Sequence, residues 1–188
     1  IFAVERGKFY GHPASLRWFE DQPDVEPSDT QPPNVEREHP LLWIPYKWSR
    51  STGNIIQNDT GGQFGPFDNQ YFVAELTNGQ ILRTTFEEID GVRQGACWLS
   101  TQGVGSAYHI EFGPDGTMYA GMTNRGWGGL SPGHGIARIK STGKIPFEME
   151  NIHLIEDGFE ITFTKPLDSF PAVTAEKYDY NWWWEYGS

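Results

Sequence analysis

The sequence contains one cysteine, few cations and no long apolar run, and each scarcity excludes a class of protein. With Cys97 alone, the chain can form neither an internal disulfide nor a four-cysteine zinc site, and it has no Cys-x-x-Cys-His motif for haem attachment. We expect Cys97 to be a small buried apolar residue, with a reactive thiol as the alternative. No apolar run approaches the roughly 20 residues that a membrane-spanning helix needs, so no membrane insertion is expected.

Cations are scarce relative to anions. There are 14 Lys and Arg against 25 Asp and Glu, so the formal net charge is −11 and the pI is near 4.8. Nucleic acids and anionic membrane surfaces are bound through basic surfaces, so neither is an expected partner. Aromatic residues are abundant instead, with 8 Trp, 8 Tyr and 12 Phe. Such rings fill sheet cores or line carbohydrate clefts, and we favour the core for most of them.

Helical periodicity is nearly absent as well. Only residues 84–90 could form a short helical turn, with a polar connection between strands as the alternative. The 22 glycines and 13 prolines fall between short runs of alternating apolar residues. This distribution predicts an all-β protein.

One sequence pattern occurs twice, in residues 71–86 and 118–140. In each copy a strand ends in Thr-Asn, and the next strand has an isoleucine two positions before an arginine. The copies lie about 46–48 residues apart, which is typical of β-propeller blades. The shared residues are Thr77, Asn78, Ile81 and Arg83 in the first copy and Thr123, Asn124, Ile136 and Arg138 in the second.

Glycine-containing turns separate the predicted strands. Asn78-Gly79 favours a type I′ hairpin, and the Pro-Asp-Gly of residues 114–116 favours a tight turn. The second copy carries an insert at residues 125–135, long enough to cover a cavity. Residues 151–164 predict a hairpin that turns at Asp157-Gly158. The sequon that begins at Asn58 indicates an exposed loop.

The chain divides in composition near residues 141–147. Residues 1–144 are predicted to be late blades of a partial propeller, with 20–40 forming an acidic, proline-rich loop that could act as a lid. Residues 145–188 are predicted to begin a second, truncated β-sandwich-like domain. Because the apolar run 182–186 would need a partner sheet, we interpret the chain as a piece of a longer protein.

The ordered motifs resemble a known family, the soluble pyrroloquinoline-quinone-dependent sugar dehydrogenases (glucose and sorbosone dehydrogenase-like), and especially their multidomain cell-envelope branch. The resemblance covers roughly residues 5–140, and the tail resembles the immunoglobulin-like domain that follows the propeller in that branch. The motifs that carry it are residues 7–13 (GKFYGHP), 64–75 (FGPFDNQYFVAE), 112–116 (FGPDG) and 123–128 (TNRGWG).

This resemblance implies a six-bladed propeller that oxidises a sugar or polyol with pyrroloquinoline quinone (PQQ), and it implies a secreted, periplasmic or cell-envelope location. The partners would be a carbohydrate or other small-molecule substrate and the remaining blades or other chains of a larger assembly. The family's cationic cofactor-binding positions correspond to Gln57, Ser106 and Tyr108, none of which is charged. The catalytic base of the family would lie outside this chain.

Other candidate residues come from the residues themselves. His109, Tyr108 and His12 could face a central funnel, although a histidine bonded within a sheet is the simpler interpretation of His109. Trp127 and Arg125 in the insert could contact a sugar, because glycine neighbours leave this indole little to pack against. Asp59, Asp68, Asn69 and Glu75 lie near glycine turns and could bind calcium, with Asp59 and Asp68 as the main candidates.

Three functions therefore remain open. The first is a PQQ-dependent sugar or polyol dehydrogenase-like oxidoreductase. The second is a non-catalytic propeller module that binds glycans or proteins in an extracellular or envelope assembly, which the uncharged cofactor positions favour. The third is a purely structural subunit.

Overall fold

The computed structural model describes residues 1–11, 38–123 and 130–174. Within these ranges the chain forms nine β-strands and no helix, which confirms the predicted all-β class. Accordingly, no helix long and apolar enough to cross a membrane occurs in this part of the chain. The predictions for His12, Arg125, Trp127, the run 182–186 and nearly all of the loop 20–40 fall outside the described residues.

The chain forms two compact units, Ile1–Trp43 with Ala172–Ser188, and Ile44–Pro171. In the first unit the terminal ammonium of Ile1 donates a hydrogen bond to the Leu42 carbonyl (2.8 Å), and Phe2 makes an edge contact with Trp43. The second unit contains all nine strands. This grouping runs across both predicted domains, 1–144 and 145–188, whose separation stays a prediction.

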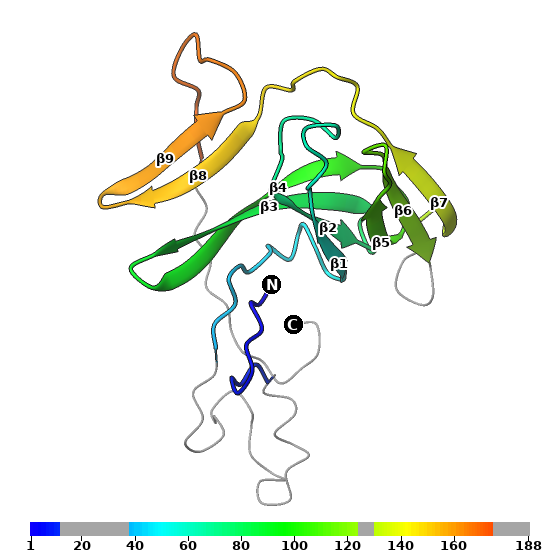
Figure 1. The fold of residues 1–188 in the computed structure, drawn as a ribbon, viewed down its shortest axis with the longest axis horizontal. Coiled ribbons are helices and arrows are strands. Elements are labelled where there is room, and N and C mark those ends of the chain that lie inside the picture. Colours follow the sequence, from blue (N-terminus) through cyan, green and yellow to red (C-terminus); the bar gives the residue numbers. More distant parts are fainter. Residues whose placement is uncertain (12–37, 124–129, 175–188) are drawn as a thin grey trace, which may run out of the picture. The chain divides into compact units, whose positions relative to one another are not determined.

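The second unit contains two larger antiparallel sheets (Figure 1). Sheet 1 has the strand order β1-β2-β3-β4, and sheet 2 has the order β5-β6-β7. Neither sheet closes on itself, as expected for part of a propeller. The strands are β1 (Thr52–Gln57), β2 (Tyr71–Glu75), β3 (Gln80–Ile89), β4 (Val92–Gln102), β5 (Ala107–Phe112), β6 (Met118–Thr123) and β7 (His134–Ile139).

The predicted hairpin at 151–164 is confirmed as β8 (Met149–Ile155) and β9 (Gly158–Phe163). Two side chains of β3 hold β8 in place. Arg83 donates to the carbonyls of Met149 (2.5 Å) and Glu150 (3.0 Å), and Glu87 accepts from the Leu154 amide (3.0 Å). The β8–β9 hairpin therefore covers part of sheet 1.

The core lies between sheets 1 and 2. Phe72, Ala74 and Ile81 of sheet 1 pack with Ile110 and other apolar residues of sheet 2, all fully or almost fully buried. Burial of each large aliphatic or aromatic side chain contributes about 1.5–3 kcal/mol. The sheet 2 residues in this core are Ala107, Ile110, Met118 and Ala120.

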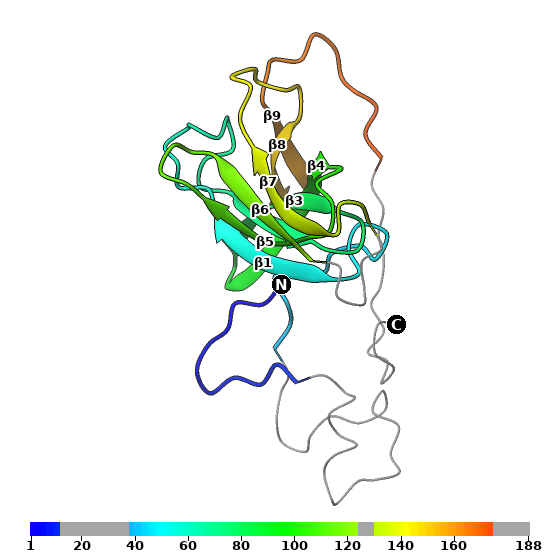
Figure 2. The same ribbon diagram turned by 90° about the vertical axis from the view of Figure 1, so that its right-hand side faces the viewer.

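The two sheets also meet through their first strands, β1 and β5, which lie side by side (Figure 2). The Asn54 side chain donates to the Ile110 carbonyl (2.8 Å) and accepts from the Ile110 amide (2.7 Å), as a neighbouring strand would. Gly53 is needed for this approach, because a Cβ there would lie 1.9 Å from the Tyr108 carbonyl oxygen. Sheets 1 and 2 are thus joined as consecutive layers.

Two local predictions were wrong. Residues 84–90 are not helical: 84–89 continue strand β3, whose turn is Asp90-Gly91, with positive φ at both residues (51° and 79°) as type I′ requires. The β2–β3 connection is instead a four-residue loop, 76–79, in which only Gly79 has positive φ. The buried Glu75 carboxylate shapes that loop by accepting the amides of Thr77 (3.2 Å) and Asn78 (2.5 Å).

Candidate functional site

The predicted site residues that the structure describes lie toward two ends of the sheets. At the first, which we call the insert end, the loops 76–79, 103–106 and 130–133 meet. A Cβ on Gly79 would lie 2.6 Å from both the Gly105 carbonyl oxygen and the Leu130 side chain. At the other, the glycine-loop end, residues 58–69 and 113–117 approach each other, because a Cβ on Gly116 would lie 2.5 Å from the Gln63 side chain.

Ser106 and Tyr108 lie at or near the insert end but in opposite environments. Ser106 is fully buried, its hydroxyl has no hydrogen-bond partner among the described residues, and its carbonyl accepts the Thr123 amide (3.0 Å). Tyr108 is 54% exposed at an irregularity in the β5–β6 pairing. His109 is exposed on the face of sheet 2 that points away from the core.

Gln57 lies at the end of β1 toward the glycine loop and is exposed. Because Gly53 contacts the Tyr108 carbonyl, Gln57 is four residues further along, or about 13 Å at the rise of an extended strand. The structure therefore does not bring Gln57, Ser106 and Tyr108 together. These positions do not fit a cofactor with three carboxylates, which needs converging cations or donors.

Asn58 organises the glycine-loop end, and the prediction that its sequon marks an exposed loop was wrong for the asparagine itself. Asn58 is fully buried. Its side-chain amide donates to the Phe67 carbonyl (3.0 Å), and its side-chain oxygen accepts from the Thr60 hydroxyl (2.7 Å). A glycan cannot occupy an amide nitrogen that is enclosed and bonded in this way.

The predicted calcium ligands lie in the same loop. Asp68 accepts the Gly62 amide (3.1 Å), and Asp59 is exposed. The described part of the chain contains no group of three or more His, Cys, Asp or Glu residues placed to hold a metal ion. A calcium site at Asp59 and Asp68 stays a prediction that would need further oxygen ligands.

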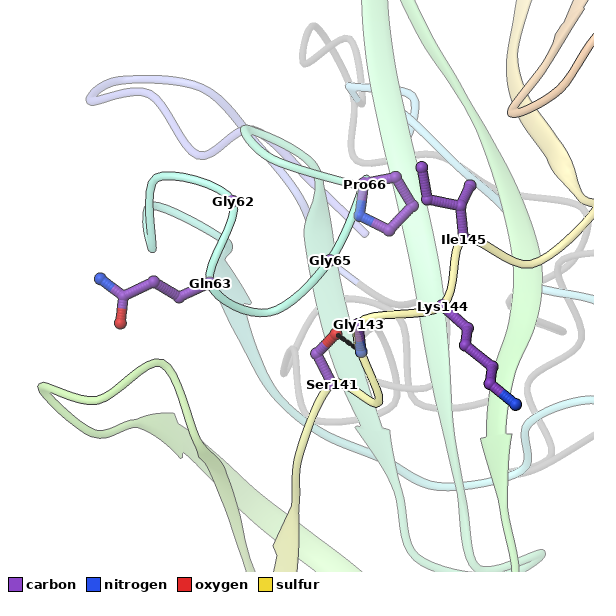
Figure 3. Close-up of a pocket in the computed structure, with 8 residues that line it drawn as sticks. All are labelled: Gly62, Gln63, Gly65, Pro66, Ser141, Gly143, Lys144 and Ile145. Carbon is purple, nitrogen blue, oxygen red and sulfur yellow. Dashed lines mark hydrogen bonds between the residues drawn. The ribbon is translucent and has the colours of Figure 1, made fainter.

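A hollow of about 410 Å³ opens between the glycine loop and the segment after β7 (Figure 3). The Pro66 ring and the Ile145 side chain supply apolar surface, and the Ser141 hydroxyl accepts the Gly143 amide (3.2 Å). Among the lining residues only Lys144 is ionisable, so the hollow contains no acid–base pair. The lining residues are Gly62, Gln63, Gly65, Pro66, Ser141, Gly143, Lys144 and Ile145.

Two perturbed groups elsewhere in the second unit have structural explanations. Burial lowers the pKa of Arg83 to about 10, against the attraction of Glu148 and Glu150. The guanidinium of Arg83 lies between the rings of Phe67 (3.9 Å) and Trp98 (4.3 Å). Burial likewise raises the pKa of the Cys97 thiol to about 11, so this thiol stays protonated at neutral pH and is a poor nucleophile.

No protein-family model matches the chain, and no curated protein matches it. Among solved structures, an oxidoreductase from Thermus thermophilus that is described as a glucose dehydrogenase is similar, with 25% sequence identity and a TM-score of 0.38 over 56% of this chain. The chain spans 29% of that protein's length.

Proposed function

We propose that this chain is the late-blade part of a sugar-dehydrogenase-like propeller that acts on a carbohydrate in a secreted, periplasmic or envelope protein. The observation that carries the proposal is the joining of sheets 1 and 2 through β1 and β5, with Asn54 paired to the backbone of Ile110. Consecutive sheets whose first strands lie side by side are the arrangement of neighbouring blades. The sequence resemblance then points to oxidation of a sugar or polyol.

Within such a protein, this chain would contribute blades to the propeller, and the positions Gln57, Ser106 and Tyr108 would not bind the quinone. Ser106 is enclosed in protein, and Gln57 and Tyr108 lie far apart along the first strands. Any PQQ would need its cationic partners from other positions.

The test is PQQ binding and dye-linked oxidation by the protein expressed from its complete reading frame. After reconstitution with PQQ and calcium, we expect quinone absorbance and oxidation of at least one sugar or polyol. Gln57→Ala and Tyr108→Ala should leave quinone affinity within about twofold, because their side chains do not converge. Absence of both signals after reconstitution would exclude the dehydrogenase.

A second candidate is a non-catalytic module that binds glycans. The distance of Gln57 from Ser106 and Tyr108, and the lack of charge at all three positions, support this candidate. Binding to a glycan array should then occur without PQQ, and Trp127→Ala should weaken it by about tenfold or more if the insert supplies a stacking ring. Phe170→Ala is the control, because this 93% exposed aromatic residue lies outside the insert. Equal binding by both variants would count against the insert as the contact.

A further inference from the structure

Strands β1, β2 and β3 of sheet 1 correspond to strands β5, β6 and β7 of sheet 2. The residues that lie opposite each other on neighbouring strands show this correspondence. Arg83 lies opposite Phe72, and Arg138 lies opposite Tyr119. Ile81 lies opposite Ala74, and Ile136 lies opposite Gly121. The first strand of each set has a pairing irregularity at the same place, Thr52–Ile55 in β1 and Ala107–His109 in β5. The two sheets are therefore copies of one repeat in the same register.

The corresponding faces differ in burial. In sheet 1, Ile81 and Arg83 face the core and are 0% and 2% exposed. In sheet 2, Ile136 is 73% exposed and Arg138 is also exposed. Tyr119 is 37% exposed, whereas its counterpart Phe72 is 1% exposed. The face that is covered on sheet 1 is thus left uncovered on sheet 2 by the residues that the structure describes.

Two polar positions follow the same pattern. His109 corresponds to Asn54, which bonds the backbone of the next sheet's first strand at Ile110. Arg138 corresponds to Arg83, which donates to backbone carbonyls of β8, yet the side chain of Arg138 makes no hydrogen bond or ion pair with the described residues. Asn54 holds sheet 2 and Arg83 holds the β8–β9 hairpin, so His109 and Arg138 stand where their counterparts hold elements that cover sheet 1.

We propose that the outer face of sheet 2 (His109, Glu111, Tyr119, Gly121, Ile136 and Arg138) docks a third antiparallel sheet of the same repeat. This rests on the propeller architecture of the proposed function. The face continues the interface between sheets 1 and 2, which supports a sheet as the occupant. A second copy of this chain cannot dock in the same way, because the faces that would do so are already buried in each copy, at Ile110 and Met118 in sheet 2 and at Val73 and Leu82 in sheet 1.

The third sheet has defined features. Its first strand would run beside β5 and present backbone groups to His109, its inner face would be apolar over Ile136, and carbonyls would lie over Arg138. It must differ from sheet 2 near Tyr108, because this side chain stands where Gly53 leaves room for the approaching carbonyl.

The test is the reactivity of a cysteine placed on this face. In a Cys97→Ser background, Ile136→Cys is treated with a maleimide in the 188-residue chain and in the product of the complete reading frame. We expect labelling to be at least about tenfold slower in the complete product, since a docked sheet must open before reaction. Val92→Cys is the control: Val92 is 63% exposed at the tip of the β3–β4 hairpin, away from the face, and should react equally in both.

Equal labelling of the Ile136→Cys variant in both forms would overturn the proposal. So would slow labelling in the 188-residue chain that accompanies dimer formation, because a second copy would then cover the face. His109→Asn should keep the protection and His109→Leu should weaken it, since only the first can pair as Asn54 does. Labelling does not depend on catalysis. Protection of the cysteine without sugar oxidation would therefore support the docked third sheet and contradict the proposed dehydrogenase activity.

Discussion

In sheet 1, Ile81 and Arg83 are buried beneath sheet 2 and the β8–β9 hairpin, whereas in sheet 2 the corresponding Ile136 and Arg138 are exposed. The residue types and the cross-strand register are the same. The difference therefore comes from what lies above each sheet. A repeated sequence pattern therefore determines the face of the sheet on which a side chain lies. How much that side chain contributes to stability depends on the element that covers the face.

The copies also differ at their back faces. Glu75 in β2 is fully buried, and its carboxylate accepts the amides of Arg50 (3.1 Å) and Ser51 (3.2 Å) besides those of its own loop. The corresponding residue in β6 is Met122. A short, carboxylate-held loop in one copy thus replaces the long insert of the other.

The largest expected effect is at Glu75. Glu75→Ala leaves four backbone amides without their acceptor, and we expect the free energy of unfolding to fall by about 4 kcal/mol. Met122→Ala should cost about 1–2 kcal/mol, because this side chain is only partly buried. Urea denaturation measures both. Equal losses would show that the carboxylate does not hold the loop.

The next effect compares the repeated isoleucines. Ile81→Ala should lower the free energy of unfolding by about 3 kcal/mol, because it removes a fully buried side chain from the core. Ile136→Ala should change it by less than about 0.5 kcal/mol in the 188-residue chain, where this side chain is mostly exposed. Similar losses in denaturant titrations would mean that Ile136 is already covered.

The repeated arginines give a smaller difference. Arg83→Met removes the charge-assisted bonds to β8 but keeps apolar contact with Trp98, and should cost about 2 kcal/mol. Arg138→Met should be close to neutral in this chain. Amide exchange of β8 is the sharper measurement, and it should speed up in the first variant alone. Unchanged amide exchange of β8 in the Arg83→Met variant would show that Arg83 does not hold β8 in place.

The smallest effect is pH dependence of the β8 contact. The Leu154 amide, with His153 and Gln94, holds the pKa of the Glu87 carboxyl below its usual value of 4.5. A lowered carboxyl pKa adds stability above pH 4.5, and this is lost as pH falls through the folded-state value. Glu87→Gln should therefore flatten the acid side of the stability profile.

The matched control is Glu88→Gln, because Glu88 is the exposed neighbour on the same strand. It should leave the acid slope unchanged in urea titrations between about pH 3 and pH 7. If both variants flatten the stability profile equally, the hydrogen bonds between Glu87 and β8 do not cause the pH dependence.

The sequence predicted much of the strand pattern because alternating apolar residues and glycine turns are local signals. The Pro-Asp-Gly turn is present, with Gly116 at φ 69°, and so is the β8–β9 hairpin. The same local rules failed at residues 84–90, where a polar run extends β3 because β4 pairs with it along its whole length. They failed again at Asn58, which is fully buried and bonded to Phe67 and Thr60.

The sequence by itself determined the all-β class, the two copies of the repeat and the correspondence of Ile81 and Arg83 with Ile136 and Arg138. Only the tertiary structure decided that Ser106 is enclosed, that Gln57 and Tyr108 lie apart, and that one copy of the repeat is covered and the other is not. The physical reason is range: side-chain alternation is set within a strand, whereas burial and convergence depend on contacts between strands far apart in the chain.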